Sequence, residues 1–116
     1  MKVLDRSWKN CLRMWEWIIH NLPEGFSEAG EETKDFIIYH LKQDWLKDNN
    51  YNRKISQNCF LCDYDMKHKG GCKSCPAVLA HPERPFHCTD GEHNYAYEPI
   101  NFYEELMNRN ARRKGD

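Results

Sequence analysis

The sequence lacks the features that place a protein in a membrane or outside the cell. No apolar run in its 116 residues approaches the roughly 20 residues that a membrane-spanning helix needs. Its first residues, Met1–Arg6, do not begin the apolar segment of a secretory signal. We therefore expect an intracellular, cytoplasmic protein whose thiols stay reduced. For its six cysteines, this expectation favours metal binding over three disulfides.

The sequence also lacks an excess of charge and the motifs of several enzyme classes. Lys and Arg number 17 against 18 Asp and Glu, so the formal net charge is −1, which is not typical of a protein that coats nucleic acid. There is no glycine-rich phosphate loop, no Ser/His/Asp arrangement and no His-x-Glu before a Pro-Cys-x-x-Cys. These absences predict a protein that is not an enzyme.

Apolar residues at steps of three and four give the main structural signal. They predict two helices within residues 5–48 that form an antiparallel hairpin, with Phe36 and His40 on the apolar stripe of the second helix. A C-terminal helix over 99–112 is expected to pack back on the hairpin. Residues 55–90 have few apolar side chains and form the third part of a single domain, residues 1–116.

Two Cys-x-x-Cys pairs, Cys59/Cys62 and Cys72/Cys75, are the strongest motif. Two intervening residues let both sulfurs of a pair face one ion, and two pairs complete a tetrahedron of thiolates. The segment 55–90 is therefore predicted to be a zinc-knuckle insertion, a small metal-centred α+β element in a mainly α fold. A closed site with four sulfur ligands holds Zn²⁺ in a structural role.

Other ligand sets and another metal remain open. Cys88 can substitute for Cys72, and His81 or His87 can replace one sulfur. An Fe–S cluster is the alternative metal, because proline follows the second pair as in ferredoxins, although the repeated Cys-x-x-Cys-x-x-Cys of those proteins is absent. Cys11 lies on the apolar stripe of the first helix, and we expect it to be a core residue and not a ligand.

Candidate contact residues lie in two places. Trp17 lies off the first apolar stripe and is a candidate contact for a partner protein. The loop between the cysteine pairs and its flank carry the other candidate partner contacts: Lys67, His68, Lys69 and Lys73. The three lysines among them could also contact phosphates. A nucleic-acid-binding zinc protein is thus the alternative function. A zinc-stapled nuclease using His68 or His93 is less favoured, because the loop between the pairs is too short for the strand, loop and helix of that site.

Four segments of the chain carry a family resemblance: Trp8–Ile18, Cys59–Tyr64, Cys72–Pro76 and Phe102–Leu106. Together they resemble small proteins of tailed bacteriophages, over most of the chain. The resemblance implies a phage-encoded protein made in the host cytoplasm. It also implies action by binding a host protein, such as defence or transcription machinery, and it assigns no catalytic residue.

Overall fold

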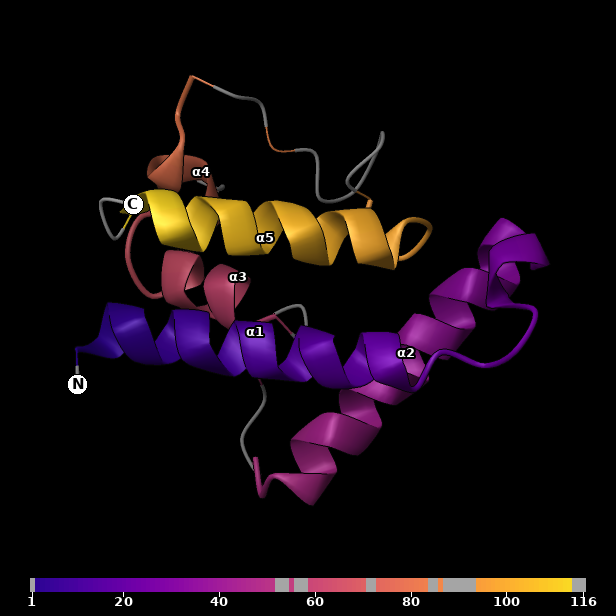
Figure 1. The fold of residues 1–116 in the computed structure, drawn as a ribbon. Coiled ribbons are helices and arrows are strands. Elements are labelled where there is room, and N and C mark those ends of the chain that lie inside the picture. The colour runs from indigo at the N-terminus through magenta and orange to yellow at the C-terminus, as the bar shows by residue number, and fades with distance from the viewer. Residues whose placement is uncertain are drawn as a thin grey trace.

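The structure is a computed structural model that describes residues 2–51, 55, 59–70, 73–83, 86 and 94–113. In chain order its elements are α1 (Val3–His20), a short 3₁₀ helix η1 (Phe26–Glu28), α2 (Glu31–Asp48), α3 (Phe60–Met66), α4 (Pro76–Ala80) and α5 (Pro99–Arg113). The prediction of a mainly helical fold is confirmed (Figure 1). None of the described helices combines the length and apolar character that crossing a membrane requires.

Helices α1 and α5 form the centre of the structure. They lie side by side and run in opposite directions, so the two ends of the chain lie on the same side of the molecule (Figure 1). The ring of Trp15 on α1 meets that of Phe102 on α5 edge to face, with centroids 4.8 Å apart. A pair of this geometry stabilises the fold by about 0.5–1.5 kcal/mol beyond the gain from burying the two rings. The predicted packing of the C-terminal helix on the first helix is therefore observed.

Helix α2 crosses α1 obliquely and does not lie along it (Figure 1). Its buried side chains are Ile38, Lys42, Trp45 and Leu46. Phe36 and His40, predicted to lie on a buried stripe, are exposed instead. The reason is that α3 and α5 also pack on α1, so much of its buried face is already covered. The predicted helix pair is present, but its second helix buries a different set of residues.

The segment predicted to be a zinc knuckle contains two short helices, and no strand occurs in its described residues. α4 begins at Pro76, where a missing N–H costs nothing because the first turn has no internal partner for it. Phe60 and Leu61 at the start of α3 are 5% and 2% exposed, and Phe60 packs edge to face on Trp45 and Tyr51. The expected α+β element is therefore not observed, because these two apolar residues anchor a helix to the core.

A buried arginine joins α5 to α4. The Arg109 side chain is 1% exposed, and its Nε donates to Glu105 at 2.6 Å. Its Nη1 donates to the carbonyl oxygens of Ala77 at 2.7 Å and His81 at 3.3 Å, at the C-terminal end of α4. Arg109 therefore satisfies carbonyl groups that a short helix cannot pair internally.

We expect Arg109→Ala to lower the free energy of unfolding by about 3–5 kcal/mol, since it strips a buried carboxylate of its guanidinium partner. Urea denaturation followed by circular dichroism measures this change. Arg112→Ala is the matched control, because Arg112 is 53% exposed and lies 3.7 Å from the exposed Glu83. An equal loss in both variants would contradict the role assigned to Arg109.

Candidate functional site

The predicted metal ligands are only partly within the described structure. Cys59, Cys62, Cys75 and His81 are described, whereas three further candidates lie outside the described residues: Cys72, His87 and Cys88. Cys11, Cys59, Cys62 and Cys75 form no disulfide, and Cys75 is buried just before α4. The zinc site built from Cys59, Cys62, Cys72 and Cys75 therefore stays a prediction.

Cys59 receives several hydrogen bonds at its sulfur. It immediately precedes α3, and the Cys-x-x-Cys spacing places Cys62 in the first turn of that helix. Side-chain hydrogen bonds from Cys11 and Cys62 hold the pKa of Cys59 well below its usual value. Donors that converge on one sulfur stabilise its thiolate, which is the form that binds metal.

Cys11 is a core residue that also contacts a predicted metal ligand. It is fully buried, as expected of a core residue. Its thiol also bonds to Cys59, and this bond, together with burial, raises the pKa of Cys11 well above its usual value. No sequence pattern predicts this contact, because a cysteine on an apolar stripe is ordinarily a packing residue.

The thiols of Cys11, Cys59 and Cys62 form a chain that is linked through Cys59. Within the described part of the protein, no group of three or more Cys, His, Asp or Glu side chains is already arranged to hold a metal ion. Sulfur donors suit Zn²⁺ and Fe–S clusters better than Mg²⁺ or Ca²⁺. The chemistry of these side chains therefore suits zinc, and the zinc site itself stays a prediction.

The turn after α3 is fixed by Asp65 and Ser74, which are both buried. The Asp65 carboxylate accepts the Ser74 N–H at 2.7 Å and the Ser74 hydroxyl at 2.9 Å. The Ser74 hydroxyl also accepts the backbone N–H of Lys69 at 3.0 Å, and the Asp65 carbonyl accepts that of Gly70 at 2.8 Å. These bonds tie the turn to the segment that leads into Cys75.

The predicted partner-contacting residues of this loop are all exposed at this turn or beside it: Lys67, His68, Lys69 and Lys73. Two of them already have partners on α3. Lys67 pairs with Asp63 at 2.9 Å, and the ring of His68 stacks on Tyr64 with centroids 4.0 Å apart. His68 Nδ1 also lies 2.7 Å from the Tyr64 carbonyl oxygen. These contacts hold the His68 side chain against α3. His93, the other histidine considered for a nuclease, lies outside the described residues.

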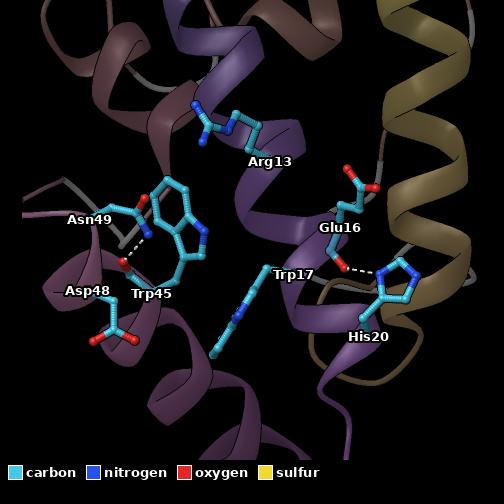
Figure 2. A pocket seen from close by; sticks show the side chains of 7 residues that line it. All are labelled: Arg13, Glu16, Trp17, His20, Trp45, Asp48 and Asn49. Atoms are coloured by element: carbon cyan, nitrogen blue, oxygen red, sulfur yellow. Dashed lines mark hydrogen bonds between the residues drawn. The ribbon is translucent and has the colours of Figure 1, made fainter.

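A cleft of about 440 Å³ opens between α1 and α2. Figure 2 shows the indole of Trp17 reaching from α1 toward α2, where Trp45 lies. The other residues that line the cleft are polar: Arg13, Glu16, His20, Asp48 and Asn49. A cleft with two indoles among polar groups suits an apolar or aromatic side chain of a binding partner, if that side chain also has a hydrogen-bonding end. The candidate contact residue Trp17 therefore lies at a concave surface.

The outer face of α2 carries exposed aromatic rings, which the sequence pattern did not predict. Phe36 is 64% exposed and Tyr39 is 54% exposed. The ring of His40 lies 4.3 Å from that of Phe36 and 5.4 Å from that of Tyr39, between centroids. We call these three residues the aromatic face of α2. The way α2 crosses α1 decides which side of α2 is exposed, because helical periodicity alone does not say which stripe is buried.

Comparison of the chain with protein-family models, with curated proteins and with solved structures finds no match.

We expect Ser74→Ala to destabilise the protein by about 1–3 kcal/mol, since it leaves buried polar groups without the hydroxyl that links them. Hydrogen exchange should show faster exchange of the Lys69 amide, and thermal unfolding should report the lost stability. Ser27→Ala, at an exposed position of η1, is the control and should change stability by less than about 0.5 kcal/mol. Unchanged exchange at Lys69 would contradict the linking role of Ser74.

Proposed function

We propose that this chain is a small zinc-stabilised binding protein of the tailed-phage type, without enzymatic activity. It acts in the host cytoplasm by binding a host protein, and inhibition of defence or transcription machinery is the expected result. The resemblance of four sequence segments supports the phage origin. The spacing of the two Cys-x-x-Cys pairs supports the metal.

The observation that carries the protein-binding proposal is the aromatic face of α2. Two large rings, Phe36 and Tyr39, are more than half exposed on adjacent turns of one helix. Exposed apolar side chains that lie together mark interaction sites more often than single ones do. Tyrosine in particular is enriched among residues that dominate interface energies.

The charges around the aromatic face indicate the chemistry of its partner. Glu32, Asp35 and Asp44 lie one turn or less from its three rings along α2, and all three are exposed. A basic partner surface with apolar side chains would complement such a rim. The cleft at Trp17 provides a separate concave contact. Either surface could receive a protein side chain, so both belong in the test.

We expect the double variant Phe36→Ser/Tyr39→Ser to lose the captured host protein by tenfold or more, about 1.4 kcal/mol of binding. The measurement is affinity capture from bacterial lysate with quantitative mass spectrometry, followed by titration of the purified partner. Ile100→Ser/Met107→Ser on α5 is the matched control, because these residues are 51% and 49% exposed.

Trp17→Ala in the same experiment tests whether the cleft contributes. Equal capture by the wild type and the Phe36/Tyr39 variant would remove the aromatic face from the proposal. Empty capture by the wild type, together with DNA binding or cleavage by the purified protein, would contradict the proposed function as a whole.

Nucleic-acid binding is the second candidate, because exposed Lys67, Lys69 and Lys73 lie at or beside one turn. Its test is the affinity for DNA and RNA at several salt concentrations, for the wild type and for Lys69→Gln/Lys73→Gln. Phosphate contacts make affinity fall steeply with salt. If the protein-binding proposal is correct, we expect weak binding that this variant leaves unchanged. A steep salt dependence that the variant reduces would favour nucleic acid instead.

A further inference from the structure

The cleft between α1 and α2 has one wall that is fixed by packing. Trp45 on this wall is 6% exposed, and its ring stacks on Tyr51 with centroids 5.9 Å apart. It also meets the ring of Phe60 edge to face, with centroids 5.8 Å apart. The Trp45 carbonyl oxygen accepts Nδ2 of Asn49 at 2.8 Å. This wall is therefore formed before a ligand binds, which lowers the entropy lost on binding.

The opposite wall is the indole of Trp17, which is only partly buried. Figure 2 shows this indole almost edge-on, with one face turned toward α2. Within the described part of the chain, its ring makes no pair with another aromatic ring and no contact with a cation. The face of an indole attracts cations more strongly than the face of any other side chain. Trp17 therefore offers an unused face to a positively charged group.

The charge of the cleft also favours a cation. Its lining includes two carboxylates, Glu16 and Asp48, and one guanidinium, that of Arg13. Two of the lining residues lie in the last turn of α1, and two lie in the last turn of α2. The C-terminal end of a helix carries a partial negative charge, so both helices add to the charge of the carboxylates. Figure 2 shows Arg13 and Asp48 on opposite sides of the two indoles.

Asp48 breaks a local rule of helix stability. It is the last residue of α2 and is exposed, and a carboxylate at this end of a helix is opposed by the helix dipole. Among the described residues, no hydrogen bond or ion pair engages its side chain. The next residue, Asn49, uses its Nδ2 on the Trp45 carbonyl, which leaves its Oδ1 as an acceptor. Residues that lower local stability without a compensating contact are more common at functional sites.

We propose that the cleft between Trp17 and Trp45 receives an arginine side chain of the partner protein. This inference rests on the proposed function and names one contact of that partner. The apolar stem of an arginine packs against the indoles, and its planar guanidinium lies on the free face of Trp17 and donates to Asp48. The cleft volume of about 440 Å³ falls within the range of small-ligand sites.

The test is a titration of the ¹⁵N-labelled full-length protein with the peptide acetyl-Gly-Arg-Gly-amide. We expect the indole N–H signals of Trp17 and Trp45 to shift and to saturate with a dissociation constant on the order of millimolar. The indoles of Trp8 and Trp15 are internal controls, because both residues are 1% exposed and do not line the cleft. The peptide with citrulline in place of arginine has nearly the same shape without the charge, and it should bind at least about threefold more weakly.

Two variants test the assigned contacts with the arginine peptide. Trp17→Ala and Asp48→Asn should each lower the affinity about threefold or more. Asp44→Asn is the matched control, because it removes the same charge one turn earlier on α2 and Asp44 does not line the cleft. Asp48→Asn should unfold at the same temperature as the wild type or higher, since it removes a carboxylate from the C-terminal end of α2. Equal losses in the Asp44 and Asp48 variants would contradict a contact at Asp48.

The outcome for this cleft is separate from the outcome for the proposed function. Equal shifts with arginine and citrulline, shifts with acetyl-Gly-Glu-Gly-amide instead, or no shift with any peptide would each overturn the arginine site. Capture of a host protein that depends on Phe36 and Tyr39 would then still support the proposed function. Empty capture by the wild type would remove the proposed function, even if the arginine peptide shifts the two indole signals.

Discussion

The buried face of α1 is the feature on which the other helices depend. Helices α2, α3 and α5 all pack on it, and α4 packs on α3 and α5. Its five buried side chains are Trp8, Cys11, Met14, Trp15 and Ile18. Two of these, Trp8 and Trp15, keep indole N–H groups that have no hydrogen-bond partner in the described part of the protein. A buried unpaired donor costs about 1–3 kcal/mol, so apolar packing on this face has to outweigh that cost.

A small core explains why a metal would help this fold. The chain has only 116 residues, and a domain of this size buries a modest core. The segment between α2 and α5 contains only two short helices among its described residues, and short helices are not stable alone. It is held by Phe60 and Leu61, by Arg109 at the end of α4 and by the Asp65–Ser74 hydrogen bonds. The proposed metal would add a further constraint on this segment.

The sequence predicted the helices better than it predicted their packing. Periodicity placed α1, α2 and α5, because that signal is local. It did not predict that α3 is a helix, since Phe60 and Leu61 are too few to show a period. It also placed Phe36 and His40 inside, because a helix with apolar residues on two sides has no single buried stripe. The contact between Cys11 and Cys59 depends on how α3 packs on α1, and no local pattern encodes it.

Metal content and stability together give the most direct test of this account. The central claim is that a metal held by thiolates supports a protein whose exposed aromatic residues bind a partner. The measurement is elemental analysis of the purified protein, with thermal unfolding before and after removal of the metal by a chelator. We predict about one zinc ion per chain and a clear loss of stability on its removal. A metal-free protein that unfolds at the same temperature with and without chelator would contradict the account.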